Sequence, residues 1–140
     1  MQDLSETVVQ ITQQLGLDAG EIKARQRFLE FGADDIARLK QVHPLIEDQR
    51  DEFAAAFYAH LLKFAPLQHL LADEATLARL KRAQAAYFSS LTEGDYGAEY
   101  VANRLRVGIA HQRIGLEPKW YIGAYCEYLS ANSGPCHGNI

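Results

Sequence analysis

Apolar residues recur along this chain at steps of three and four, which places them on one face of an α-helix. The clearest series follows Asp73 and contains Leu77, Leu80, Gln84, Tyr87 and Leu91. No stretch alternates with the period of two that a half-buried β-strand would show. The pattern therefore predicts an all-α fold of seven or so helices.

The residues between these stretches predict where helices begin and end. Asp73 is suited to accept a hydrogen bond at a helix N-terminus, and Gly115 to end a helix in the left-handed conformation. Pro44 suits the first turn of a helix, where its missing N–H is not needed, so we predict a break before it. The predicted helices are 4–15, 21–31, a short one from Asp34 or Asp35 to Val42, 44–64, a single turn at 67–71, one after Asp73, 96–114 and 118–129.

Length and composition narrow the class of protein. The length of 140 residues suits one domain. Of these residues 48% are apolar and 23% charged, as in an ordinary globular protein. The formal charge of −4 argues against nucleic acid as a partner. No apolar run approaches the ~18 residues of a membrane span, and the N-terminus does not resemble a signal peptide. With two cysteines, a reduced cytoplasmic setting is expected, with no membrane partner.

His111 is the strongest candidate for chemistry. It stands near the end of the predicted helix 96–114, on the same side as Val107. A neutral imidazole is the usual axial ligand of haem iron, and its second ring nitrogen would need an acceptor, either the Val107 carbonyl or Tyr121. Gly108 would let a flat macrocycle approach the helix closely. Spacing alone leaves the alternative open, which is a half-buried histidine bonded to a neighbour.

Tyr58 and Leu80 are candidates for the opposite side of such a pocket. In a dry pocket the Tyr58 hydroxyl would donate a hydrogen bond to bound O2, worth more than the ~0.5–1.5 kcal/mol of an ordinary one. Leu80, on the inward face of the helix after Asp73, would exclude water. The alternative interpretation makes both residues ordinary members of the core.

The chain contains no nucleophile motif. Gly-x-Ser-x-Gly, the P-loop and His-Glu-x-x-His are all absent from the sequence. We therefore expect a protein that is not an enzyme.

The segment Asn103–Tyr125 resembles the proximal region of the sensor globin of globin-coupled sensors, a bacterial group related to protoglobins. Phe31–Leu39, and Phe57-Tyr58 followed by Pro66, support the resemblance, which covers residues 22–129. It implies a globin-like helical sandwich that lacks the usual short fourth helix.

The resemblance also implies a cofactor and roles for individual residues. Haem b would be bound non-covalently, with His111 as the proximal ligand of its iron. Tyr58 matches the distal tyrosine that contacts bound oxygen, and Leu80 matches a second distal position. Tyr121 matches a tyrosine beside the proximal histidine, whereas Ala83 stands where some members carry a second ligand-contacting threonine.

The resemblance further suggests how the chain is organised. Residues 1–21 are expected to form an N-terminal helical extension, 22–129 an incomplete sensor globin domain, and 130–140 an atypical tail. The last helix of the globin fold is expected to be missing. Family members form homodimers and carry a signalling output domain, such as a diguanylate cyclase or a chemotaxis transducer.

These observations predict a haem-based O2 sensor domain, with CO and NO as further ligands. It would bind O2 reversibly and regulate a C-terminal output domain in signal transduction. A haem-free globin-fold module for interaction or dimerisation is the alternative from a different class. A haem enzyme, such as an NO-consuming dioxygenase, is a third reading.

Overall fold

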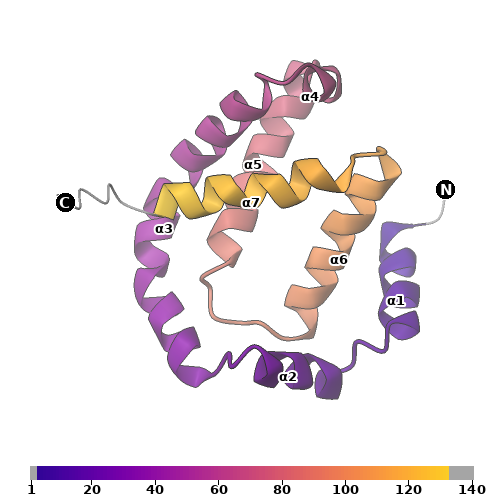
Figure 1. The fold of residues 1–140 in the computed structure, drawn as a ribbon, viewed down its shortest axis with the longest axis vertical. Helices are drawn as coiled ribbons and strands as arrows, with labels where there is room; N and C mark the ends of the chain where they lie inside the picture. Colours follow the sequence, from indigo (N-terminus) through magenta and orange to yellow (C-terminus); the bar gives the residue numbers. More distant parts are fainter. Residues whose placement is uncertain (1–2, 133–140) are drawn as a thin grey trace. The chain divides into compact units, whose positions relative to one another are not determined.

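The all-α prediction is confirmed. The computed structural model describes residues 3–132, and these contain helices and no strand. The helices are α1 (Leu4–Gln14), α2 (Ala19–Phe28), α3 (Ala33–Leu61), α4 (Ala65–Leu70), α5 (Glu74–Ser90), α6 (Ala98–Arg113) and α7 (Pro118–Asn132) (Figure 1). No helix among these residues is both long and apolar enough to cross a bilayer.

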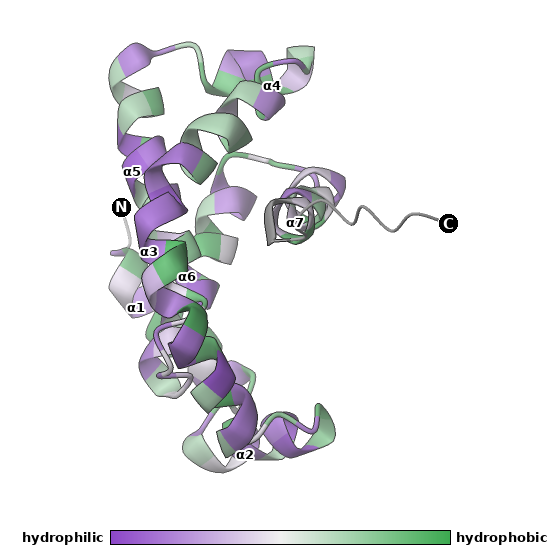
Figure 2. Ribbon diagram, turned by 90° about the vertical axis from the view of Figure 1, so that its left-hand side faces the viewer, coloured by the Kyte–Doolittle hydropathy of each residue, from purple (hydrophilic) through white to green (hydrophobic). Residues whose placement is uncertain are grey.

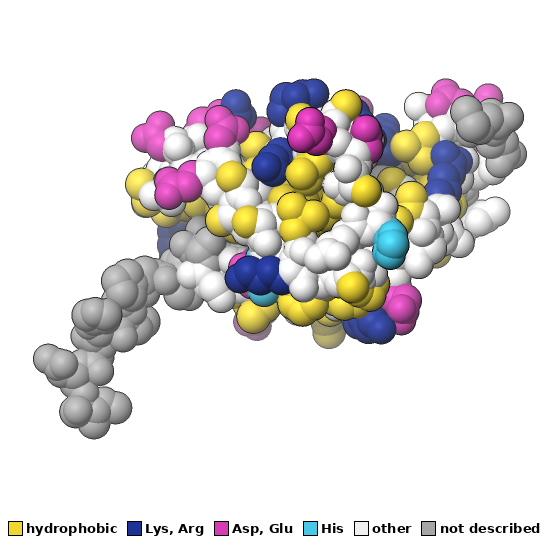
Figure 3. Space-filling view, turned by 90° about the horizontal axis from the view of Figure 1, so that it is seen from above, with side chains coloured by type: hydrophobic (Ala, Val, Ile, Leu, Met, Phe, Trp, Pro, Cys, Tyr) yellow, Lys and Arg dark blue, Asp and Glu magenta, His cyan; other side chains and the backbone are white. Residues whose placement is uncertain are grey.

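The helices divide into two units. The His111 unit consists of Met1–Gly32 and Asp95–Ile140 and holds α1, α2, α6 and α7. The Tyr58 unit consists of Ala33–Gly94 and holds α3, α4 and α5. Hydrophobic and hydrophilic residues are mixed along the helices (Figure 2), and they are separated onto different sides most clearly in α1. Acidic and basic side chains are interspersed on the face drawn in Figure 3.

Local capping interactions set the helix ends nearest the candidate residues. The Asp73 carboxylate accepts a hydrogen bond from the Thr76 N–H at 2.8 Å, so α5 begins as predicted. At the end of α6, Gly115 has a φ of +68°. The N–H of Gly115 donates to the Gln112 carbonyl, and that of Leu116 donates to the His111 carbonyl, both at 3.0 Å. This paired arrangement is the Schellman motif, and it ends α6 just after His111.

The break predicted before Pro44 is wrong. Helix α3 runs without interruption for 29 residues and contains Pro44 in its interior. A proline there removes one backbone hydrogen bond and costs ~3 kcal/mol. Packing of α3 against α5 and against the turn after it offsets that cost, and the isolated pattern of residues 34–64 carries no sign of this packing.

Several other helix ends also differ from prediction, among them the C-terminal ends of α2 and α7. Helix α2 ends at Phe28, short of the predicted Phe31. Glu30 adopts a left-handed φ of +54°, and the Phe31 N–H then donates to the Gln26 carbonyl at 2.9 Å. Helix α7 continues to Asn132 beyond the predicted end at Leu129. The rest of the predicted tail, residues 133–140, lies outside the described residues.

Aromatic packing holds the Tyr58 unit together. Helices α3 and α5 lie side by side (Figure 1), and the rings of Phe53 and Phe88 stack with centroids 4.0 Å apart. Phe57, Ala54 and Ala85 are buried with them. An aromatic pair of this kind adds ~0.5–1.5 kcal/mol beyond the burial of its area.

In the His111 unit, α1 packs against α6 (Figure 1), and Val8 and Ile109 are buried. Three aromatic rings pack in sequence up to the first turn of α6. The Phe31 ring packs edge-on against Tyr96, with centroids 5.3 Å apart, and Tyr96 packs against Tyr100 with centroids 5.0 Å apart. The Arg104 guanidinium lies 3.7 Å from the centre of the Tyr100 ring, within range of a cation–π contact.

Gly94 is the position at which glycine is most strongly required. Its φ is +94°, and a Cβ there would overlap the aliphatic stem of Lys40. We therefore expect Gly94→Ala to lower the free energy of unfolding by more than about 1 kcal/mol, measured by urea denaturation.

Gly32→Ala is the matched control for this substitution. Gly32 has no left-handed φ, and no described atom lies within 4 Å of where its Cβ would be. It should therefore be neutral or slightly stabilising. Equal stability of the two variants would contradict the assignment.

Candidate functional site

The sequence of α6 places His111 in its last turns, where the side chain is half-buried. Burial lowers the pKa of His111, because removal from water disfavours the charged imidazolium. The ring is therefore neutral at neutral pH, and one nitrogen has a free lone pair. That is the protonation state required of a metal ligand.

Tyr121 lies directly against His111. The two rings are stacked, with centroids 5.3 Å apart and planes 13° from parallel. The turn that Gly115 closes brings this about, because α7 begins at Pro118 and carries Tyr121 in its first turn. The contact that the structure shows is a ring stack. The predicted hydrogen bond from the second imidazole nitrogen to Tyr121 or to the Val107 carbonyl stays a prediction.

Val107 and Gly108 lie one helical turn before His111, on the same side of α6. Val107 is half-buried and Gly108 exposed. A glycine inside a helix costs ~1 kcal/mol relative to alanine, yet no described atom lies within 4 Å of where a Gly108 Cβ would be. The packing of the described residues gives no reason for glycine here. A flat ligand that approaches the helix beside His111 would give one.

Tyr58 is held in the C-terminal part of α3, and only 7% of its surface is exposed. Burial raises the pKa of Tyr58 to about 12, although the positive charge of Arg79 acts in the opposite direction. The phenol therefore keeps its proton throughout the physiological range and is available as a hydrogen-bond donor.

Leu80 lies on α5 and is half-buried. Its neighbour Arg79 acts electrostatically on Tyr58, so this part of α5 faces the tyrosine. Ala83 follows one turn later and offers no side-chain donor. The sequence analysis did not predict that Arg79 would act on Tyr58. The available signal in the sequence was the position of Arg79 directly before Leu80.

The donor set limits what kind of metal centre this chain can form. Across residues 3–132, no three His, Cys, Asp or Glu side chains gather closely enough to hold a metal ion. A metal bound at His111 would therefore need a ligand that brings its other donors with it. A porphyrin does so, and the neutral imidazole and the open helix face at Gly108 are compatible with one.

A family comparison identifies the chain. The model of the protoglobin family matches residues 18–132. The chain belongs to the protoglobin family. The predicted globin-like fold and the suspected relationship to sensor globins are thereby confirmed.

Individual relatives of this protoglobin agree with that assignment. Over 121 residues it is 38% identical to the heme-based aerotactic transducer HemAT of Halobacterium salinarum. The match covers 86% of this chain and 25% of the transducer, so the chain spans about a quarter of that relative's length. The globin domain of a globin-coupled sensor from Geobacter sulfurreducens has a similar structure, with a TM-score of 0.69 and 31% identity. That match covers 78% of this chain and 70% of the other.

One relative is named an aerotactic transducer and the other a globin-coupled sensor. The predicted roles of His111, Tyr58, Leu80, Tyr121 and Val107 stay predictions. The structure brings Tyr121 onto His111, and it brings the Arg79–Leu80 turn of α5 toward Tyr58.

Proposed function

We propose that this protoglobin is a haem-based sensor domain that binds O2 reversibly, with haem b held by His111. The observation that carries the proposal is the half-buried, neutral His111, stacked on Tyr121 and one turn from an open glycine. The names of the relatives support it, since one is a heme-based aerotactic transducer and the other the globin domain of a sensor.

The residues of α6 and α7 have distinct roles in this proposal. His111 donates a nitrogen lone pair, and the Tyr121 ring holds the plane of the imidazole. Val107 provides an apolar contact, and Gly108 leaves room for a flat macrocycle. When bound, haem supplies the iron centre at which O2, CO or NO can bind.

Tyr58 and Leu80 favour the gas-bound state. Tyr58 keeps its proton and donates it as a hydrogen bond to the ligand, while Leu80 excludes competing water. Ala83 cannot add a second donor, so retention of the ligand depends on Tyr58 to a greater degree. A hydrogen bond in a dry site is stronger than one in water.

The proposal extends to the surrounding architecture. Residues 22–129 form the globin domain, 1–21 a helical extension and 130–140 a divergent tail, in a cytoplasmic protein that works as a homodimer. Its output is a diguanylate cyclase or a chemotaxis transducer, in keeping with the greater length of the aerotactic transducer. Regulation requires that the free and gas-bound states differ in their interactions, and the stack of His111 on Tyr121 links α6 to α7 for that purpose.

The first prediction concerns the iron ligand. Haem-reconstituted protein should show a Soret band and a five-coordinate ferrous spectrum, and His111→Ala should abolish that spectrum because the axial nitrogen is lost. Added imidazole should restore it, which separates loss of the ligand from loss of the fold.

His69→Ala, an exposed position on α4, is the control and should leave the spectrum unchanged. A wild-type spectrum in the His111 variant would remove the axial assignment. Absence of a Soret band from the unaltered protein would favour the haem-free interaction module.

The second prediction uses the glycine before His111. Gly108→Ala should stabilise the haem-free chain by ~1 kcal/mol, yet speed haem dissociation, because its methyl group occupies the approach to the helix. Denaturation of the haem-free chain and haem transfer to an acceptor protein measure the two effects.

Gly123→Ala in α7 is the matched control. Gly123 also lies inside a helix, with no described atom within 4 Å of where its Cβ would be. It should give the same stabilisation without faster haem loss. Equal haem retention in both variants would argue against a macrocycle beside Gly108.

The third prediction concerns the distal hydrogen bond. Tyr58→Phe should speed O2 dissociation, by up to about tenfold for ~1.4 kcal/mol lost. In the unaltered protein the rate should stay constant from neutral pH to about pH 10, because the raised pKa of Tyr58 keeps the phenol protonated. Stopped-flow measurements across this range test both statements.

Tyr125→Phe is the control, since Tyr125 is exposed on α7. It should leave the O2 dissociation rate unaltered. An unchanged rate in the Tyr58 variant would mean that the hydroxyl does not contact the ligand.

A further inference from the structure

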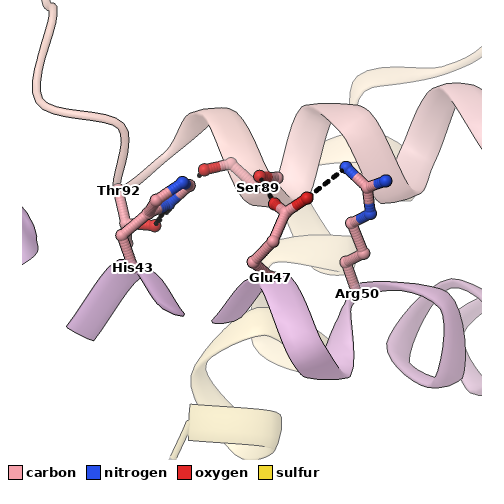
Figure 4. A network of polar contacts seen from close by, with 5 residues as sticks. All are labelled: His43, Glu47, Arg50, Ser89 and Thr92. Carbon is pink, nitrogen blue, oxygen red and sulfur yellow. Dashed lines mark hydrogen bonds and ion pairs between the residues drawn. The ribbon is translucent and has the colours of Figure 1, made fainter. Parts of the chain in front are cut away.

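A network of polar side chains joins α3 to the end of α5 (Figure 4). The Ser89 hydroxyl donates to the Glu47 carboxylate, which also pairs with Arg50 at 2.7 Å. One turn earlier on α3, the Nδ1 atom of His43 lies 2.9 Å from the Thr92 hydroxyl oxygen. Two residues of α3 therefore pair with one residue of α5 and with Thr92 in the turn just after it, and we call His43, Glu47, Ser89 and Thr92 the register network.

The hydroxyls in this network have partners both within one helix and across the two helices. The Thr92 hydroxyl donates to the Ser89 carbonyl at 3.3 Å. Its contact with Nδ1 of His43 is a hydrogen bond whose donor depends on the tautomer of the ring. Ser89 donates to Glu47, and both cross-helix pairs form together in one alignment of the helices.

Burial makes this alignment hard to give up. Ser89 is 3% exposed and Thr92 7% exposed. A slip of one helical turn would leave the buried Ser89 hydroxyl without the Glu47 carboxylate, which is unfavourable. It would also break the contact between Thr92 and His43, although Thr92 would keep its local bond to the Ser89 carbonyl. The stacked rings of Phe53 and Phe88 hold the same two helices together, but apolar contacts are less selective for register. Buried polar groups that specify register are well attested in packed helices.

The same alignment determines what lies opposite Tyr58. Glu47 lies four residues after His43 on α3. Ser89, which pairs with Glu47, lies three residues before Thr92, which pairs with His43. The two series run in opposite directions, as antiparallel helices require. Tyr58 lies eleven residues beyond Glu47 on α3, and Arg79 lies ten residues before Ser89 on α5. These separations are about 15–17 Å along the helix axes. This register brings Arg79 to about the level of Tyr58, which accords with the lowering effect of the Arg79 charge on the Tyr58 pKa.

Pro44 makes the position of the network significant. It lies between His43 and Glu47 and cannot donate a backbone hydrogen bond within α3. A helix bends most readily at such a residue. The network ties α3 to α5 at residues on both sides of Pro44, and so opposes a bend that would displace Tyr58 relative to Leu80.

We infer that His43, Glu47, Ser89 and Thr92 are positioning residues for ligand retention, because they set the register of α3 on α5 and thereby place Tyr58 level with Leu80. This inference rests on the proposed function for its effect on O2, but its structural part applies equally to the haem-free chain. A one-turn slip would move Tyr58 by ~5.4 Å relative to α5, which is too far for a hydrogen bond to survive.

The test compares Thr92→Val, which removes the hydroxyl, with Thr92→Ser, which keeps it. In the haem-loaded protein, Thr92→Val should speed O2 dissociation about two- to tenfold, whereas Thr92→Ser should retain the wild-type rate. In a Tyr58→Phe background, Thr92→Val should have no further effect, because its action passes through the tyrosine. In the haem-free chain, NMR signals of the Tyr58 ring should shift in the valine variant and not in the serine variant.

Asp18→Ala is the control for a loss of stability alone. It removes the carboxylate that caps α2 in the His111 unit, where Asp18 accepts from the Glu21 N–H at 2.8 Å. It should leave both the O2 dissociation rate and the Tyr58 ring signals unchanged.

Two results would overturn the inference. One is a Thr92→Val protein that is less stable but has wild-type Tyr58 signals and O2 dissociation. The other is an equal acceleration with and without the Tyr58 hydroxyl. If Tyr58→Phe itself does not change O2 dissociation, the proposed distal role fails, and the NMR comparison alone decides whether the network sets the register.

Discussion

Desolvation is the physical effect that sets the protonation states of both His111 and Tyr58. Removal from water disfavours whichever form of a group is charged, so it lowers the pKa of a histidine and raises that of a tyrosine. In this protein it acts on His111 and Tyr58 in opposite senses. One ring is left with a bare lone pair and the other retains its proton, and these are the electronic states that a metal ligand and a hydrogen-bond donor require. Neither residue needs a charged partner to reach its state.

Burial of these two groups requires a rigid surrounding structure, which the helices provide by different means. In the Tyr58 unit, stacked phenylalanines and a partly buried polar network hold α3 against α5. In the His111 unit, α1 covers part of α6, and a row of rings that ends at Arg104 lines the first half of that helix. The helices that carry His111 and Tyr58 are therefore stabilised by contacts between other residues.

How much of this could be predicted from sequence depended on the range of the interactions involved. The caps at Asp73 and Gly115 are formed by residues within a few positions of one another, and both were predicted correctly. The continuity of α3 through Pro44 was not, because it depends on contacts with residues more than forty positions away. Likewise, His111 and Tyr58 stand out in the sequence through family resemblance. The parallel stacking of Tyr121, the influence of Arg79 and the pairing of Ser89 with Glu47 emerge only once helices are placed side by side.

The turn after α6 determines how a displacement of His111 would be transmitted to α7. The carbonyl oxygen of His111 itself accepts the bond that closes this turn, and the side chain of the same residue touches the ring of Tyr121 beyond it. The backbone of His111 therefore contacts the start of the segment that joins α6 to α7, and its side chain contacts Tyr121 beyond that segment, which turns at Gly115. A displacement of the imidazole would therefore act directly on the start of α7, and the remainder of either helix would not need to transmit it.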